Sequence, residues 1–482
     1  MVFSSPIFLF YFFPLVLLFY FLFPAKNLFL LLAGLFFYAW GETHYVLILL
    51  ISIGLNYLSG ILIGNATEGN RRKFFLWVGL SLNLTLLVFF KYVNFFAANF
   101  NQILHWMRLS AIAVEPVHLP LGISFFTFQA MSYLIDVYRK NNEAVRNPLD
   151  LGLYISMFPQ LVAGPIVRFG DIADQIKKRE VNRSDFTCGI RRFVAGLAQK
   201  MLIANILAVP ADAVFAVPHQ SLTTSLAWLG TISYTLQIYF DFSGYSNMAI
   251  GLGLMFGFRF PENFNFPYIS KSITEFWRRW HISLSSWFRD YLYIPLGGNR
   301  RGVLRTYINL IIVFFLCGLW HGADWTFVIW GFYHGMFIVI ERMGLGRWLK
   351  GLWSPLAHFY TMIIICVGWV WFRSESVDQA ILMTAALFGR SGGNNMIYDI
   401  NQFLTREVLF VLPIAVMFSM PLIPGFQFLT NIPAIKENPG KALQFKKRLF
   451  YGLEALTVLV IMFFVAYQLA AQTHNPFIYF RF

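Results

Sequence analysis

Apolar segments long enough to cross a lipid bilayer are the feature that most constrains this chain. Four of them fit or approach the required length: 74–98, 304–319, 325–340 and 452–471. A helix needs about 20 apolar residues to span a hydrocarbon core of ~30 Å. Because the bilayer core holds no water, backbone groups there must be satisfied internally, so we expect these segments to be helices. The sequence lacks the short alternating strands of a membrane barrel, and it therefore predicts an all-α polytopic membrane protein.

Composition argues against a soluble nucleic-acid-binding protein. Hydrophobic residues make up 58% of the chain and charged residues only 12%, whereas soluble domains carry about 25% charged residues. The formal net charge of +14 is concentrated in short loops between apolar segments. Basic residues in such loops set orientation and contact anionic lipids. We therefore expect membrane lipids, and no nucleic acid, as partners.

Clusters of basic residues set the predicted topology. They lie at 71–73, 139–146, 168–192, 271–305 and 446–448. If all of these clusters face the cytoplasm, the predicted spans give one consistent topology. In this topology both termini lie on the extracytoplasmic side of the inner membrane. The predicted spans include residues 7–23, 27–40, 44–63, 74–98, 118–138 and 449–472.

One apolar segment, 154–165, is interrupted by Pro159, Gly164 and Pro165. Both of its flanks lie in basic clusters, so we predict a re-entrant segment surrounded by protein. In total we expect about 11–13 transmembrane helices plus re-entrant helices. They form a single domain, 1–482, with a motif-bearing core at about 118–345 and C-terminal helices at about 355–475. No positive charge precedes the first apolar run, so we expect the first helix to be retained.

Cysteine and histidine spacing gives no indication of a metal site. Cys188, Cys317 and Cys366 are too few and too scattered for a disulfide framework or a zinc site. The sequence also lacks the hydrolase elbow, the metalloprotease motif and the nucleotide-binding loop. We expect no metal and no bound cofactor.

The segment 270–299, SKSITEFWRRWHISLSSWFRDYLYIPLGGN, has the pattern of an amphipathic helix. Ser272 followed by Glu275 predicts a capping box at its start. Apolar and aromatic residues then fall on one broad face at helical spacing, namely Trp277, Trp280, His281, Leu284, Phe288 and Tyr291. Much of the remaining surface carries Arg278, Arg279 and Arg289, whose planar forks suit a phosphate-bearing donor. The alternative is an interfacial helix anchored by Trp and Arg.

A second histidine, His321, lies in LCGLWHGADWTFVIW at 316–330. An ionisable residue at membrane depth is a functional candidate by default, although a satisfied core histidine is the alternative. A neutral imidazole can remove a proton from a hydroxyl near neutral pH. Acyl transfer from a thioester needs little more than such a base, orientation and an oxyanion donor.

Asp241 lies inside the otherwise apolar segment 236–253, LQIYFDFSGYSNMAIGLG. A lone carboxylate there is costly unless it is paired, so it orients a histidine, holds an arginine or forms a purely structural link. The run GLGLMFG at 251–257 has the wrong spacing for a dinucleotide fingerprint. Close packing of helices through small residues explains this run better.

Together these stretches resemble the membrane-bound O-acyltransferase (MBOAT) family, nearest to the bacterial branch that includes the alginate O-acetyltransferase membrane subunit. The resemblance covers nearly the whole chain, from MVFSSPIFLF and FYAW through PLGISFFTFQAMSYLIDVYR and FPQLVAGPIVR to NPFIYFRF. Its most specific parts are YFDFSGYSNMAIGLG, FPENFNFPYISKSITEFWRRWHISLSSWFRDYLYIPLGGNR and LWHGADWTFVIWG.

The resemblance implies a catalytic His321 with His281 in support. It also implies a helical ring with a thinned centre, where a cytoplasmic funnel meets an extracytoplasmic one and an acyl group crosses without its carrier. We expect the tunnel to be supported by Trp320, Asp241, Tyr239, Ser243 and Trp277. The implied donor is acetyl-CoA or an acyl carrier thioester. The implied acceptor is a hydroxyl of an extracytoplasmic SGNH-type acetyltransferase, of another acyl-relay partner, or of a polysaccharide itself.

Several functions remain compatible with the motifs. Related members serve alginate, other exopolysaccharides, peptidoglycan and the D-alanylation of teichoic acids, and alginate is the nearest neighbour. A transporter or flippase for the acyl donor is an alternative of another class, although the sequence shows no internal repeat. A scaffold that recruits a soluble acetyltransferase without chemistry of its own is the third hypothesis.

Overall fold

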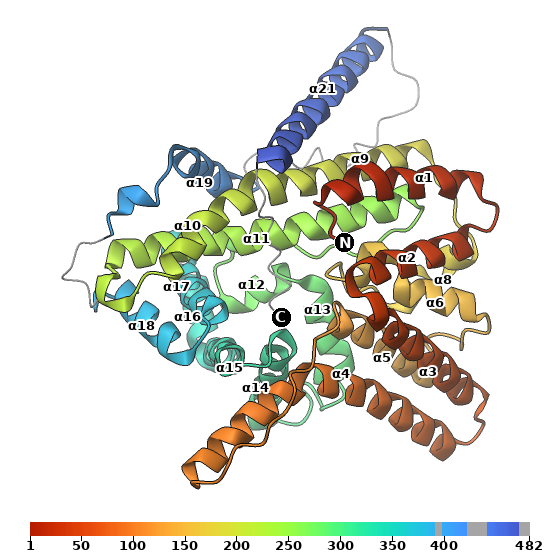
Figure 1. Ribbon diagram of the computed structural model, residues 1–482, viewed down its shortest axis with the longest axis horizontal. Coiled ribbons are helices and arrows are strands. Elements are labelled where there is room, and N and C mark those ends of the chain that lie inside the picture. Colours follow the sequence, from red (N-terminus) through yellow and green to blue (C-terminus); the bar gives the residue numbers. More distant parts are fainter. Residues whose placement is uncertain (391–397, 422–440, 472–482) are drawn as a thin grey trace.

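The computed structural model describes residues 1–390, 398–421 and 441–471, except for the side chains of 441–451, and in this part of the chain every regular element is a helix (Figure 1). The first helices are α1 (Phe13–Leu22), α2 (Lys26–Glu42), α3 (Val46–Asn65), α4 (Gly69–Trp106), α5 (Ile123–Arg139), α6 (Pro148–Ser156), α7 (Phe158–Leu161) and α8 (Phe169–Lys177). The central ones are α9 (Arg183–Ala198), α10 (Asn205–Phe215), α11 (Thr224–Met255), α12 (Ile273–Arg279) and α13 (Ile282–Phe288). The last are α14 (Val303–His321), α15 (Trp325–Ile340), α16 (Gly346–Gly351), α17 (Ser354–Arg373), α18 (Val377–Leu387), α19 (Arg406–Phe418) and α21 (Lys441–Ala471).

Short π- and 3₁₀-helical turns extend or connect these helices. They are η1 (Phe8–Phe12), η2 (Thr43–Tyr45), η3 (Gln199–Ala204), η4 (His219–Ser221), η5 (Pro267–Ile269), η6 (Arg289–Tyr293), η7 (Glu341–Leu345) and η8 (Ile400–Gln402). Within the described residues the prediction of an all-α protein is therefore confirmed.

Six helical stretches among the described residues are long and apolar enough to cross a membrane. They are Lys26–Asn65, Gly69–Trp106, Arg183–Phe215, Val303–His321, Ser354–Arg373 and Gly452–Ala471. The first of these contains both α2 and α3. These stretches support a multi-pass membrane protein, while the larger number of spans and the orientation of the termini stay predictions.

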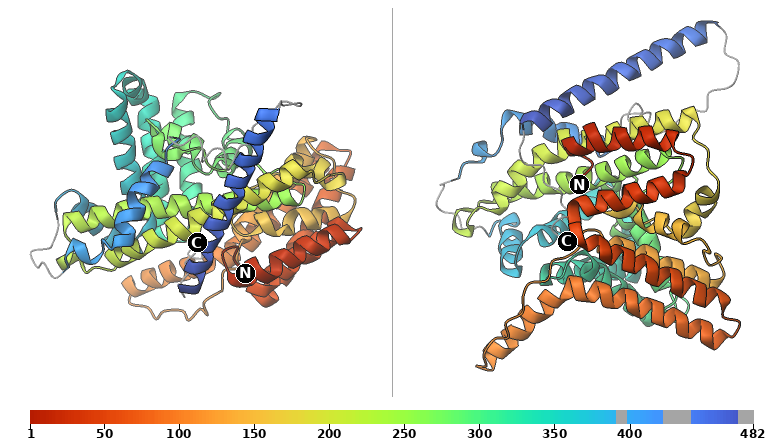
Figure 2. Two further views of the ribbon diagram at one scale, coloured as in Figure 1. Left: turned by 90° about the horizontal axis from the view of Figure 1, so that it is seen from above. Right: turned by 45° about the vertical axis from the view of Figure 1, so that its right-hand side comes forward.

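A pair of long, packed rods crosses the middle of the molecule (Figure 1). One rod is α11, and the other runs through α9, η3 and α10. The N-terminal helices gather on one side of these rods and α14–α18 on another, with α12 and α13 between the two groups. The C-terminal α21 extends away from the rest of the molecule (Figure 2).

Glycines allow the two central rods to approach backbone to backbone. A Cβ atom on Gly196 would lie 2.4 Å from the carbonyl oxygen of Gly244, and one on Gly251 would lie 2.6 Å from that of Gly189. Such close approach is the usual role of small residues in membrane helices. At Gly251, the interpretation of GLGLMFG as a packing surface is confirmed.

Glycines also close the hairpin of α14 and α15. A Cβ atom on Gly318 would lie 2.3 Å from the carbonyl oxygen of Phe327, and one on Gly331 would lie 2.3 Å from that of Phe314. Asp324 caps α15 by accepting a hydrogen bond from the backbone N–H of Thr326 at 2.9 Å. The hairpin therefore fixes the end of α14, where His321 lies.

The predicted break in the segment 154–165 is present. Helix α6 ends at Ser156, Met157 is extended with ψ 111°, and α7 follows as a single turn. The residues from Leu151 to Ile166 are buried by protein, as irregular backbone at membrane depth requires. Whether this segment is re-entrant stays a prediction.

The prediction of one continuous amphipathic helix in 270–299 is wrong. The helix ends at Arg279 and restarts at Ile282, and His281 between them adopts a left-handed conformation with φ 45° and ψ 55°. The cause is the preceding loop, which forms hydrogen bonds with backbone groups that a continuous helix would use. Asn265 N–H donates to the carbonyl of Arg279, and Ile282 N–H donates to the carbonyl of Asn263, both at 2.9 Å.

The predicted cap at the start of this segment is confirmed in part. Ser272 Oγ accepts a hydrogen bond from the Glu275 N–H at 3.0 Å. The Glu275 carboxylate accepts from the Lys271 N–H at 3.0 Å, one residue earlier than a capping box requires.

The close packing of the central rods predicts a large effect of one methyl group. Gly196→Ala should force α9 and α11 apart, because the new Cβ would overlap a carbonyl oxygen, and such overpacking costs about 1–3 kcal/mol of stability. The matched control is Gly54→Ala in α3, where the new Cβ meets open space. Thermal unfolding of the detergent-purified protein should show a lower Tm for the first variant only. Equal Tm values for the two variants would contradict the packing argument.

Candidate active site

His321 is the last residue of α14 and lies in an aromatic cage. Only 4% of the residue is exposed. Its ring centroid lies 4.9 Å from that of Trp320, 5.1 Å from that of Trp330 and 5.2 Å from that of Phe372, all in edge-on geometry. Within the described residues, neither ring nitrogen has a hydrogen-bond partner. Aromatic packing therefore surrounds the imidazole, and the hydrogen-bonding capacity of both nitrogens is unused among these residues.

His281 is fully buried at the break between α12 and α13. Its Nδ1 atom lies 3.1 Å from Asn263 Oδ1, which also accepts a hydrogen bond from Ser283 Oγ at 2.8 Å. The amide group of Asn263 donates to Ser246 Oγ at 3.0 Å. Because a carboxamide oxygen only accepts, this arrangement assigns the proton to Nδ1 and leaves Nε2 as an acceptor.

Trp320 joins the two histidines, which come from segments far apart in the sequence. Its ring centroid lies 6.1 Å from that of His281 and 4.9 Å from that of His321. Trp277 adds to this cluster through Trp330, at a centroid distance of 5.7 Å. The structure thus brings four of the predicted site residues into one buried cluster, while their catalytic roles stay predictions.

A polar cavity of about 370 Å³ is lined in part by Asn263 and Ile282, which adjoin His281. Tyr239 and Ser243, two of the predicted tunnel residues, contribute to its wall. So do several side chains with amide groups, including Asn263, which holds His281. The cavity therefore reaches the immediate neighbours of one histidine.

A second, mostly apolar cavity of about 270 Å³ lies on another side of α12 and α13. Arg278 and Arg289 line it, together with Arg342. Its wall also includes Cys317, which precedes His321 by one turn of α14. Two of the three predicted donor-binding arginines thus share a cavity that approaches His321.

The third predicted donor-binding residue, Arg279, is engaged elsewhere. Its guanidinium pairs with Glu275 at 2.9 Å and donates to the backbone carbonyl of Asn265 at 3.1 Å. Arg289 is also paired, with Asp290 at 2.7 Å. Although partial burial acts to raise it, hydrogen bonds from Arg289 and Arg168 hold the pKa of Asp290 below its usual value.

Asp241 is paired, as its burial requires, but the partner is a lysine. Its carboxylate lies 2.5 Å from Lys200 Nζ, and the two side chains are 1% and 3% exposed. The pair joins α11 to η3, which favours the structural interpretation of Asp241 that the sequence left open. No group of three or more His, Cys, Asp or Glu side chains suited to a metal ion occurs among the residues that the structure describes.

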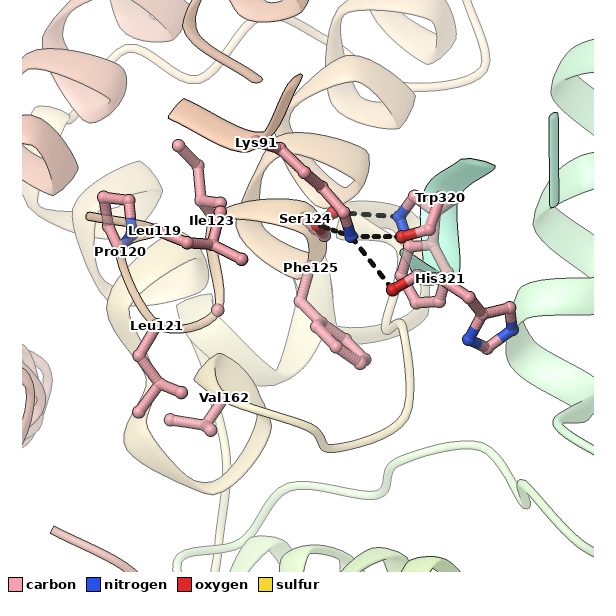
Figure 3. A pocket seen from close by; sticks show the side chains of 11 residues that line it. Lys91, Leu119, Pro120, Leu121, Ile123, Ser124, Phe125, Val162, Trp320 and His321 are labelled. Atoms are coloured by element: carbon pink, nitrogen blue, oxygen red, sulfur yellow. Dashed lines mark hydrogen bonds between the residues drawn. The ribbon is translucent and has the colours of Figure 1, made fainter. Parts of the chain in front are cut away.

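Lys91 is a site neighbour that our sequence analysis missed. It lies on α4, is 6% exposed, and donates hydrogen bonds to the backbone carbonyls of Trp320 and His321. It also lines a small cavity of about 20 Å³ with these residues (Figure 3). A lysine in the middle of the apolar run 74–98 is the signal that could have identified it.

Comparisons with known proteins agree with this architecture. The model of the MBOAT, membrane-bound O-acyltransferase family, matches residues 74–372. A protein of Azotobacter vinelandii named "Probable alginate O-acetylase AlgI" is 44% identical over 100% of both chains. The peptidoglycan O-acetyltransferase of Helicobacter pylori is 35% identical over 100% of this chain and 98% of its own. The teichoic acid D-alanyltransferase of Bacillus subtilis is 30% identical over 52% of this chain and 68% of its own.

The match of the family model covers more than half of the chain, and the full-length relatives are similar throughout. With its membrane-spanning helices, the chain belongs to the membrane-bound O-acyltransferase family and is an acyltransferase.

Proposed function

We propose that this acyltransferase moves an acetyl group from a cytoplasmic thioester to a hydroxyl on the far side of the inner membrane. The observation that carries the proposal is the buried cluster of His321, Trp320 and His281. In it, His321 keeps both ring nitrogens without a partner among the described residues. A buried polar group held in this way by packing is suited to a partner that arrives with the substrate.

In the proposed reaction, His321 acts as general base. Its neutral imidazole accepts the proton of the acceptor hydroxyl, and the hydroxyl oxygen attacks the thioester carbonyl. The new C–O bond forms as the C–S bond breaks, and the released thiolate takes up the proton. His281, fixed by Asn263, supports the reacting groups from its position next to Trp320.

The donor is proposed to bind in the apolar cavity beside α12 and α13. Arg278 and Arg289 on its wall belong to the basic cluster 271–305, which is predicted to face the cytoplasm, and Arg342 lines the same wall. Guanidinium groups bind phosphate through paired hydrogen bonds, and acetyl-CoA presents several phosphates, so acetyl-CoA is the proposed donor. The wall residue Cys317 lies one turn of α14 from His321.

The acceptor is proposed to be a polysaccharide, with alginate first and peptidoglycan or another exopolysaccharide second. The basis is the activity named for two full-length relatives, which are 44% and 35% identical to this chain. An extracytoplasmic SGNH-type acetyltransferase is proposed as the intermediate acceptor. Both termini are proposed to lie on that same side of the membrane.

Replacing His321 by Ala should abolish transfer, because the base is lost while the packing of α14 and α15 remains. General base catalysis accelerates a reaction by about 100- to 10,000-fold. We therefore expect the rate of transfer to fall by at least about 100-fold. The measurement uses inside-out membrane vesicles with labelled acetyl-CoA and follows both thiol release and label on the enclosed polysaccharide. His105→Ala, at an exposed position near the end of α4, is the matched control. Normal acetylation by the His321 variant would exclude it as the base.

The donor cavity predicts that substitutions of neighbouring arginines differ in their effect on KM. Arg278→Gln and Arg289→Gln should each raise KM for acetyl-CoA by about tenfold, since a hydrogen bond to a charged group contributes about 1.5–3 kcal/mol. Arg279→Gln is the control, because this side chain does not line the cavity and contacts Glu275 and Asn265 instead. Steady-state kinetics of thiol release give the KM values. An equal rise in all three variants would point to a general charge effect and would contradict the assigned cavity.

A further inference from the structure

The ammonium group of Lys91 is buried at the site, but the proposed reaction does not use it. Gly79, Asn83, Leu87 and Lys91 recur at intervals of four residues and form the buried stripe of α4. This periodicity points the lysine into the protein instead of into lipid. Lysine is costly at membrane depth, and such residues are retained mostly where they have a function.

Among the described residues, the hydrogen-bond partners of Lys91 are neutral oxygens. Its Nζ atom donates to the backbone carbonyl of Trp320, to that of His321 at 3.3 Å and to Ser124 Oγ at 3.2 Å. It also lies 5.8 Å from the centroid of the Trp320 ring. Within the part of the chain that the structure describes, no carboxylate forms an ion pair with it. The terminal amino group is therefore committed to the end of α14.

The end of a helix is the place where such a contact has most effect. The last carbonyl groups of an α-helix have no partner within the helix, and a cation near them is favourable. After His321, the chain leaves the helix at once, since Gly322 is extended with φ −156°. No further helical turn fixes the position of His321, so contacts from α4 add to those of the α14–α15 hairpin.

The two sides of residue 321 face different surroundings. Its carbonyl oxygen points toward Lys91, while its imidazole points the opposite way, away from the small cavity (Figure 3). On that opposite side the ring meets Trp330 and Phe372. Anchoring the carbonyl therefore restricts the direction in which the imidazole can project.

We propose that Lys91 is a positioning residue for acyl transfer, which acts by holding the backbone of His321 so that the imidazole stays aligned with the reacting groups. This inference rests on the proposed role of His321. Misplacement of a reacting group by about 1 Å can cost about 100-fold in rate. Replacing Lys91 should therefore slow the chemical step much more than it weakens binding of the donor.

The test compares Lys91→Met, Lys91→Arg and Tyr92→Phe in the full-length protein, with wild type and His321→Ala assayed in parallel. Tyr92 is the matched control, because its hydroxyl donates at 2.7 Å to the carbonyl of Leu319 on the same helix end. The readouts are the amount of protein in the membrane, and kcat and KM for thiol release from acetyl-CoA in the inside-out vesicles.

Lys91→Met should lower kcat at least about tenfold with KM changed less than about twofold, as expected for an interaction that matters after binding. Lys91→Arg should recover most of kcat, and Tyr92→Phe should stay close to wild type. The inference is overturned if Lys91→Met keeps the kcat of wild type, or if Tyr92→Phe loses as much activity and Lys91→Arg recovers none.

If Lys91→Met does not accumulate in the membrane, Ser124→Ala decides the question. This variant removes one of the three anchors of the ammonium group and leaves the lysine in place. A fall in kcat at constant KM supports the inference, and an unchanged kcat overturns it. If the wild type releases no thiol from acetyl-CoA, or if His321→Ala is fully active, the proposed function itself is contradicted.

Discussion

Polar groups buried where water does not reach must find partners within the protein, and the arrangement of helices depends on this constraint. An unpaired polar group costs several kcal/mol, on the order of a lost hydrogen bond or more. Asn56 of α3 and Asn83 of α4 exchange two hydrogen bonds at 3.0 and 2.8 Å. Lys200 and Asp241 pair between η3 and α11. Each of these contacts joins two helices, so satisfying the polar groups also determines which helices are neighbours.

The two histidines are among the buried polar groups that keep atoms without a partner in the described residues. His281 is satisfied on one side only, through Asn263, and the ring nitrogens of His321 find no partner among the described residues. Aromatic rings surround the imidazole of His321, while the hydrogen bond from Lys91 reaches its backbone carbonyl. Leaving a buried polar atom without a partner costs stability, and at a functional site such a cost is typical of residues whose partner is a substrate.

Sequence predicted those features of the fold that depend on local composition. Apolar runs located α3 and α14, because burial in a membrane requires them along the whole helix. The glycine run around Gly251 and the cap at Ser272 were equally local signals. The clustering of His321 with His281 was implied only by resemblance to a family, because no local pattern relates segments so far apart.

Features that depend on a distant segment were not predictable in this way. The break at His281 arises because Asn263 and Asn265 take the backbone groups that a continuous helix would use, while the periodicity around His281 fits an unbroken helix well. Lys91 carried a visible signal, a charge within an apolar run, but its partner on α14 could not be read from α4. The lysine partner of Asp241 was hidden for the same reason.

The break at His281 has a consequence for how the proposed transfer could work. The short helices α12 and α13 separate a polar cavity that reaches Asn263 from an apolar cavity that reaches Cys317. The left-handed turn between these helices lets His281 project into the aromatic cluster instead of along a helix face. An acetyl group is small, so under the proposed mechanism only its carbonyl needs to enter the cluster while the bulk of the donor stays outside. Tight aromatic packing around His321 then excludes water, which would otherwise compete with the acceptor hydroxyl for the thioester.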